Sequence, residues 1–100
     1  MSNAVFYNSY KLKKGSSIPD FLAAVDNLTM EISKRKGFVS TSLLREGDTW
    51  ADYSTWETMD DLNAFLEDAQ TNKSELAETF YSFLNFSSCI TRAYSVEKSW

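Results

Sequence analysis

Four segments of the chain have the residue types of β-strands, and each carries apolar side chains at both odd and even positions. The first segment divides into two sets, with Phe6, Tyr10 and Leu12 on one face of a sheet and Val5 and Tyr7 on the other. A sheet with helices on one face and water on the other would carry polar residues on its wet face. Because exposed apolar sheet promotes aggregation, we expect helices to cover one face and a second subunit to cover the other.

The remaining strands show the same two-sided pattern. In the expected hairpin, one parity holds Phe38, Leu44, Trp50 and Trp56, and the other holds Val39, Leu43 and Tyr53. In the last strand, the residues on one side are Ile90, Tyr94 and Val96, and those on the other are Cys89 and Ala93. The pattern therefore predicts a homodimer in which sheet packs against sheet.

The order of the elements indicates a ferredoxin-like α+β fold. Strands are expected at residues 4–12, 38–45, 49–56 and 87–96, with a short turn at 46–48 between the middle two. One helix separates the first two strands, and a second helix followed by a helical turn precedes the last strand. This β-α-β-β-α-β order predicts a four-stranded antiparallel sheet in one domain spanning residues 1–100.

Capping residues mark the ends of the expected helices. The N-caps are Ser17, Thr58 and Ser74, with Asp20 and Asp61 as capping-box partners of the first two. We expect the first helix to run to residues 34–36, whose three cations suit a helix C-terminus. Gly37 would then be the glycine that follows the helix end.

Composition excludes several kinds of site. The chain has no histidine, so we expect neither a metal site nor a Ser/His/Asp or Cys/His centre. Cys89 is the only cysteine, which rules out an intrachain disulfide, and we interpret it as a small buried hydrophobe. The net charge of −4, with only two short basic clusters, argues against nucleic-acid binding. No segment approaches the ~20 apolar residues of a membrane span and no signal peptide is evident, so we expect a cytoplasmic protein without membrane contact.

One candidate base is Asp52, which lies between two tryptophans of the expected third strand. Its pKa would rise if the carboxylate were desolvated there. A pair with Arg45 or Arg92 is the interpretation we favour, because buried carboxylates are usually paired. Asp60 and Asp61 resemble a catalytic carboxylate pair, but their place in a first helical turn makes them capping and dipole residues.

Three stretches together resemble the dimeric α+β-barrel superfamily, and within it the antibiotic biosynthesis monooxygenase type of domain. They are YKLKKGSSIPDFLAAVDNL, KGFVSTSLLREGD and ADYSTWETMDDLNAFLED. The markers are a strand that ends in Lys-Gly, an early helical Phe, a Gly before the second strand and a Trp-Glu-Thr step after the third. The similarity spans essentially the whole chain. It implies a dimer whose sheets close into a barrel, with a small-molecule pocket between sheet and helices.

The superfamily includes cofactor-free oxygenases, haem-degrading enzymes and members without a known activity. Asn8 stands seven residues before Gly15, as an Asn does in the haem-degrading branch. The positions of that branch's second Trp and of its haem-ligating His hold Phe65 and Glu75 here, and Lys36 replaces its customary Pro. The resemblance therefore does not imply haem ligation.

The expected pocket has six candidate lining residues, namely Asn8, Phe6, Tyr10, Trp56, Phe65 and Phe80. Asn8 could orient a substrate carbonyl or dioxygen, or it could be a buried amide satisfied within the sheet. Tyr10 could donate a hydrogen bond to a polar ligand head, or it could only pack in the core. No residue is assigned a catalytic role.

Three functions fit these observations. The one we favour is binding of a small hydrophobic molecule, an acyl chain or an aromatic, between sheet and helices. The second is a cofactor-independent monooxygenase acting on a polycyclic phenol, where the protein positions the substrate and excludes water. The third is a structural dimer module without a ligand. None needs a cofactor, so none is expected, and the sequence does not decide whether the protein is an enzyme.

Overall fold

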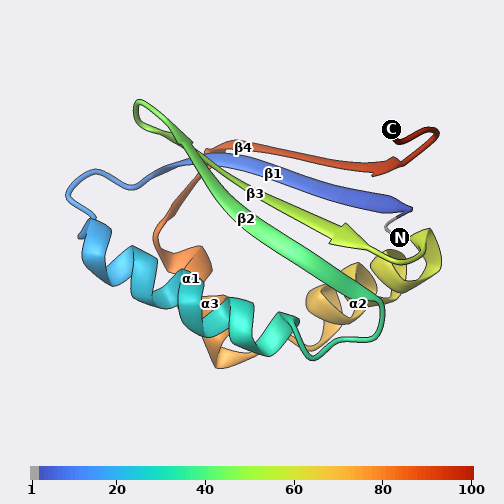
Figure 1. The fold of residues 1–100 in the computed structure, drawn as a ribbon. Coiled ribbons are helices and arrows are strands. Elements are labelled where there is room, and N and C mark those ends of the chain that lie inside the picture. The colour runs from blue at the N-terminus through green and yellow to red at the C-terminus, as the bar shows by residue number, and fades with distance from the viewer. Residues whose placement is uncertain (1–2) are drawn as a thin grey trace.

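A computed structural model describes residues 3–100 and has the element order β-α-β-β-α-α-β. The elements are β1 (Ala4–Leu12), α1 (Ile18–Ile32), β2 (Phe38–Glu46), β3 (Thr49–Trp56), α2 (Met59–Thr71), α3 (Glu75–Ser82) and β4 (Leu84–Ser95). The strands form one antiparallel sheet in the order β2-β3-β1-β4. All three helices lie on one face of this sheet, and none of the elements formed by the described residues covers the other face (Figure 1). The ferredoxin-like α+β fold predicted from the sequence is confirmed.

The three predicted caps form where the sequence placed them. The side chains of Ser17, Thr58 and Ser74 accept hydrogen bonds from the backbone N–H three residues on, at 3.3, 3.0 and 3.1 Å. Each bond satisfies one of the N–H groups that a helix start leaves unpaired. These caps fix the boundaries of the layer that covers the sheet.

The end of α1 differs from the prediction. The helix stops at Ile32, and residues 34–36 lie in the turn beyond it. The backbone N–H groups of Lys34 and Arg35 bond three residues back, at 3.3 and 2.9 Å, which tightens the chain out of the helix. Gly37 is therefore not the residue after the helix end; its φ of +84° serves the turn into β2 instead.

The faces of β2 near the hairpin differ from the prediction, because the turn has two residues instead of three. Glu46 pairs with Thr49, which moves the β2–β3 register by one residue. Leu43 consequently packs against the core, whereas Leu44 lies on the uncovered face and is 47% exposed. The prediction had these two leucines on the reverse faces. A β-bulge at Val39 shifts the register back at the start of β2.

Two clusters of buried side chains hold the sheet to the helices. The larger is built on Tyr10, Phe21, Trp50, Phe80 and Leu84, and the smaller on Ala4, Trp56 and Leu62. The even residues of β1 and β3 supply most of the sheet side, as expected from their alternation. The last strand begins at Leu84, three residues earlier than predicted, because Leu84 pairs with Leu12 of β1. Between residues 3 and 100, no helix combines the length and the apolar character that crossing a membrane requires.

Candidate functional site

A cavity of about 100 Å³, here called the chamber, lies between the sheet and the helices. Its sheet side includes Phe6, Asn8, Asp52 and Ser54. Its helix side is mainly apolar and includes Val25, Leu28, Ile32, Phe65, Leu66, Phe80 and Tyr81. Three strands and three helices thus enclose a small space whose walls are largely aliphatic and aromatic, with most of its polar groups on the strands.

Asp52 is the one acidic or basic residue that lines the chamber among the described residues. Burial raises the pKa of its carboxyl from 3.8 to about 6, while the hydrogen bond from Tyr10 acts in the opposite direction. The Tyr10 hydroxyl donates to Asp52 Oδ1 at 3.1 Å. The same burial, together with the charge of Asp52, raises the pKa of the Tyr10 phenol well above its ordinary value. The pair is therefore held as a neutral phenol that donates to a partly desolvated carboxyl.

The favoured expectation for Asp52, a pair with an arginine, is wrong. The guanidinium of Arg45 stacks over the Trp50 ring at 4.5 Å, and its Nε donates to the Gly47 carbonyl at 2.9 Å. Arg92 lies opposite Tyr7, on the uncovered face of the sheet, and donates to a backbone carbonyl. Neither cation faces the chamber, so the alternative of a desolvated carboxyl with a raised pKa is the arrangement found.

Asn8 is the register partner of Asp52 across β1 and β3. Its side chain is 9% exposed, and its Oδ1 accepts a hydrogen bond from the Thr91 hydroxyl of β4 at 3.0 Å. Thr91 thus holds the Asn8 amide through its oxygen, Oδ1. The amide and the carboxyl lie side by side on the floor of the chamber.

Of the six residues predicted to line the pocket, the structure places Phe6, Asn8, Phe65 and Phe80 on the chamber wall. Tyr10 and Trp56 are 1% and 0% exposed and lie behind the wall. Tyr10 reaches the chamber through its bond to Asp52, and Trp56 supports Phe65 by stacking on its ring at 4.9 Å. What any of the six contributes to a ligand site remains a prediction.

Sequence reasoning did not place Asp52 or Tyr81 among the pocket residues. Asp52 lines the chamber because it pairs with Asn8, and the sequence signal was available in the shared parity of Trp50, Asp52 and Trp56. Tyr81 is half-buried and borders the chamber and two neighbouring cavities. No sequence pattern predicts that Tyr81 lines the chamber, because its position depends on how α3 packs against α1.

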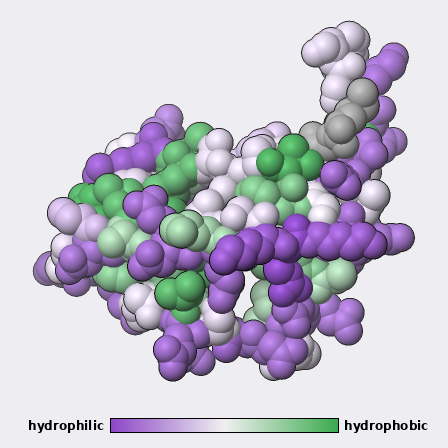
Figure 2. Space-filling view, turned by 60° about the horizontal axis from the view of Figure 1, so that its bottom comes forward, coloured by the Kyte–Doolittle hydropathy of each residue, from purple (hydrophilic) through white to green (hydrophobic). Residues whose placement is uncertain are grey.

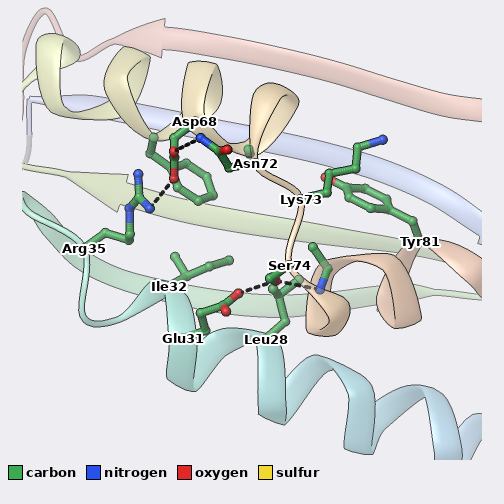
Figure 3. Close-up of a pocket in the computed structure, with 12 residues that line it drawn as sticks. Leu28, Glu31, Ile32, Arg35, Asp68, Asn72, Lys73, Ser74 and Tyr81 are labelled. Atoms are coloured by element: carbon green, nitrogen blue, oxygen red, sulfur yellow. Dashed lines mark hydrogen bonds and ion pairs between the residues drawn. The ribbon is translucent and has the colours of Figure 1, made fainter.

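A second cavity of about 160 Å³, here called the mouth, opens between α1, α2 and α3 (Figure 3). The mouth and the chamber share five wall residues, Leu28, Ile32, Phe65, Ala69 and Tyr81, so the two spaces adjoin. The helical side of the molecule is polar over much of its surface, with apolar residues visible in places between the polar ones (Figure 2). The mouth is therefore a candidate route from solvent to the chamber.

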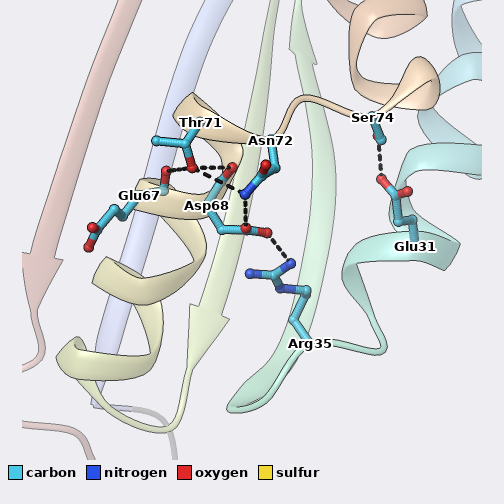
Figure 4. A network of polar contacts seen from close by, with 7 residues as sticks. All are labelled: Glu31, Arg35, Glu67, Asp68, Thr71, Asn72 and Ser74. Atoms are coloured by element: carbon cyan, nitrogen blue, oxygen red, sulfur yellow. Dashed lines mark hydrogen bonds and ion pairs between the residues drawn. The ribbon is translucent and has the colours of Figure 1, made fainter.

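Polar contacts frame the mouth on two sides (Figure 4). Arg35, in the turn after α1, pairs with Asp68 of α2 at 2.5 Å, and its guanidinium lies 5.6 Å from the centre of the Phe65 ring. The Asn72 amide and the Arg35 guanidinium hold the pKa of the Asp68 carboxyl below its usual range. On the other side, the Ser74 hydroxyl donates to Glu31 of α1 at 2.7 Å. These contacts link α1 to α2 and to the start of α3 across the opening.

A third space of about 360 Å³ adjoins the chamber beside β4 and shares Phe6, Asn8, Leu66, Ala69 and Tyr81 with it. Its outer wall contains Lys73, Phe86 and Cys89. Burial raises the pKa of the Cys89 thiol, which favours the unreactive protonated form. Cys89 also packs against the larger core cluster, in the manner of a small apolar residue.

No family model matches the sequence, and no curated protein matches it. The fold, in contrast, recurs among solved structures, which include oxygenases and a protein described as dimeric ferredoxin-like. SnoaB, a cofactor-independent oxygenase from Streptomyces nogalater, matches with a TM-score of 0.78 and 17% identity over 99% of this chain and 97% of that chain.

Two further structures have the same arrangement. A monooxygenase from the gene ActVA-Orf6 of Streptomyces coelicolor, solved with the ligand nanaomycin D, has a TM-score of 0.69 at 15% identity, over 99% of this chain and 91% of that chain. A dimeric ferredoxin-like protein from an uncultured marine organism has a TM-score of 0.73 at 8% identity, over 100% and 92%. At these identities the likeness establishes the fold, and the fold that the sequence resemblance implied is confirmed.

Proposed function

We propose that this protein binds a small, flat, mainly apolar molecule in the chamber, with the polar end of the ligand at Asn8 and Asp52. The observation that carries the proposal is the chamber itself. It is enclosed by aromatic and aliphatic side chains and holds one partly desolvated carboxyl. Apolar pockets with a few convergent polar groups and a perturbed pKa are the usual form of small-molecule sites.

The size of the chamber limits the shape of such a ligand. Pockets for drug-sized molecules have volumes of about 300–1,000 Å³, and the chamber alone has about 100 Å³. A bicyclic or tricyclic ligand would therefore extend from the chamber into the mouth, whose volume is about 160 Å³. Because the two spaces share Phe65 and Tyr81, both rings would contact such a ligand along its length.

Filling the cavity tests this proposal. Ala69 borders the chamber, the mouth and the space beside β4, so Ala69→Phe would occupy the volume that a ligand needs. Ala64→Phe places the same ring on the exposed side of α2 and is the matched control. Calorimetric titration with 2-naphthol should give saturable binding in the wild type and in the control, and at least about tenfold weaker binding in Ala69→Phe. Equal binding by both variants, or no binding by the wild type, would contradict the proposal and favour a filled structural module.

A second candidate function is cofactor-independent oxygenation of a phenol. It is favoured by the raised pKa of Asp52, because a carboxyl with a pKa of about 6 can accept a phenolic proton at neutral pH. The resulting anion would give its electrons to dioxygen; a ring CH₂ would become a carbonyl that carries one oxygen atom, and the second oxygen would leave as water. The chamber would contribute position and exclusion of bulk water.

Oxygen uptake with anthrone and related polycyclic phenols tests this second function. Asp52→Asn keeps the shape of the side chain and removes the base, so the rate should fall by about 10²-fold or more. Uptake that is equal in the wild type and in Asp52→Asn would exclude Asp52 as the base. Rates unchanged in Asn8→Ala would remove Asn8 from the reaction.

We also infer that the uncovered face of the sheet packs against a second copy of the chain. The face carries Val39, Leu44, Tyr53, Ile90 and Tyr94, each between 40% and 52% exposed. Apolar side chains in such numbers on one face are typical of an interface. A protein of the same fold is described as dimeric, which supports a homodimer here.

A further inference from the structure

Asn8 and Asp52 form a pair of unlike hydrogen-bonding groups at one point of the sheet. They are register partners on β1 and β3, and both line the chamber. Side chains at such positions have Cβ atoms about 4.5–5.5 Å apart on the same face. A single ligand edge can therefore reach both groups at once.

Each member of the pair has one atom that is already bonded and one that is not. Asp52 Oδ1 accepts from the Tyr10 hydroxyl, and Asn8 Oδ1 accepts from the Thr91 hydroxyl. Among the described residues, Asp52 Oδ2 and Asn8 Nδ2 have no hydrogen-bond partner, yet no fully buried side-chain nitrogen or oxygen lacks one. Neither atom is therefore fully buried, and both residues line the chamber.

The two anchoring hydroxyls also fix which atom of each group remains available. Tyr10 is 1% exposed and held among Phe21 and Phe80 by edge contacts at 6.2 and 5.8 Å, so its hydroxyl cannot leave Asp52 freely. Thr91 is positioned by the pairing of β4 with β1 directly beside Asn8. The chamber floor consequently presents a carboxylate acceptor next to an amide donor.

We propose that the ligand carries a hydrogen-bond donor and an acceptor next to each other on one edge, as a cyclic amide does. Its donor would bond to Asp52 Oδ2 and its acceptor would receive a bond from Asn8 Nδ2. This assignment rests on the proposed function for the existence of a ligand, and it names the head group that the site selects. A simple phenol would use Asp52 alone and leave the Asn8 donor unpaired, which costs binding energy in a buried site.

The charge of the chamber supports a neutral head group. Among the described residues, no lysine or arginine lines it, and Asp52 is its one carboxylic acid. A ligand carboxylate would therefore meet a like charge without a compensating cation. The cations Arg35 and Lys73 lie at the mouth, away from the chamber lining.

A set of flat bicyclic probes of similar size tests the proposal: 2-quinolinone, N-methyl-2-quinolinone, 2-naphthol and naphthalene. The first offers donor and acceptor, the second only the acceptor, the third a hydroxyl and the fourth neither. Calorimetric titration should rank 2-quinolinone first by about tenfold or more over each of the others, since every mismatch leaves a buried group unpaired. Equal affinity for all four would contradict the proposed role of Asn8 and Asp52 in selecting the head group, but not the proposal of an apolar ligand site. Binding of none would overturn both proposals.

Asp52→Asn provides a second, independent test. With Tyr10 still bonded to Oδ1, the new amide would offer a donor where the carboxylate offered an acceptor. The preference should therefore reverse, with 2-quinolinone losing at least about tenfold and N-methyl-2-quinolinone gaining relative to it. A variant that binds all four probes with the wild-type ranking would contradict the proposal. Thermal unfolding of the variant at the same pH separates these outcomes from a failure to fold.

Discussion

At the scale of single residues, Asp52 is the position where stability and function conflict. The fold places its carboxyl beside the chamber without a cation, so the ionised form is disfavoured and the pKa rises to about 6. The group that costs stability at neutral pH is also the group best suited to accept a ligand's proton or hydrogen bond. Such conflicts are typical of sites that a protein uses.

The raised pKa of Asp52 gives a pH dependence with a definite sign. The folded state holds the proton more tightly than the unfolded state, so the free energy of unfolding falls as the pH rises from about 4 to about 6 and then levels off. A shift of roughly two pKa units corresponds to about 3 kcal/mol at most. Asp52→Asn should therefore be more stable than the wild type at pH 8 by up to that amount, with the difference vanishing near pH 4. Urea denaturation at several pH values measures it.

An exposed acid provides the control for this prediction. Asp60→Asn, in the first turn of α2, should lower stability slightly at neutral pH, because it removes a charge that favours the helix dipole. The two variants thus change stability in opposite directions. A wild type and an Asp52→Asn variant with parallel pH profiles would show that Asp52 is well solvated in the folded protein.

At the scale of the elements, the sequence predicted most where the signal is local. The caps at Ser17, Thr58 and Ser74 and the bounds of β1 and β3 depend on neighbouring residues, and these predictions are confirmed. The bulge at Val39 could not be predicted from the sequence, because an extra residue does not change the hydrophobic pattern of a strand that is apolar at both odd and even positions. The place of Asp52 in the chamber wall likewise depends on the β1–β3 register, which is a tertiary property.

Gly37 links the turn after α1 to the start of α2. Its φ is +84°, and a Cβ at this position would collide with the side chain of Asp61 in the first turn of α2. Gly15 has a similar φ of +81° but open space around it. Gly15→Ala should cost about 1–2 kcal/mol from the left-handed backbone alone. Gly37→Ala should cost about 1–3 kcal/mol more, as overpacking does. Equal costs in thermal unfolding would mean that α2 can shift away from the turn.

The Arg35–Asp68 pair bridges the mouth, so we predict that it slows ligand exchange. Arg35→Met keeps an apolar stem over Phe65 and removes the bond to Asp68. Association and dissociation rates of 2-naphthol in stopped-flow fluorescence should both rise several-fold, with stability changing by less than about 1 kcal/mol because the pair is half-exposed. Lys34→Met removes the same charge from an exposed neighbour with no ion pair among the described residues. Unchanged rates in Arg35→Met would indicate that the ligand enters through the space beside β4 instead of the mouth.

At the scale of the whole molecule, the fold separates two kinds of apolar surface. The helical side of the sheet encloses the chamber, and the opposite side presents exposed apolar residues from β2, β3 and β4, with no element of the described residues above them (Figure 1). The sequence predicted this two-sided character directly, from strands apolar at both parities. It could not predict the shape of the chamber, which depends on how far apart the three helices stand.

A homodimer through the uncovered face is the expectation that follows for the assembled protein. Tyr53 lies on β3, inside the sheet, and is 40% exposed on this face. In a two-fold interface, Tyr53→Lys would place a cation on each copy in the buried patch. The dissociation constant of the dimer should therefore rise by 100-fold or more, about 3 kcal/mol. Met30 is 65% exposed on α1, and Met30→Lys adds the same charge outside the face as a control. Sedimentation velocity at micromolar concentration should give a dimer for the wild type and for Met30→Lys and a monomer for Tyr53→Lys. A wild type that sediments as a monomer would contradict the dimer, and a dimeric Tyr53→Lys would move the interface off the sheet.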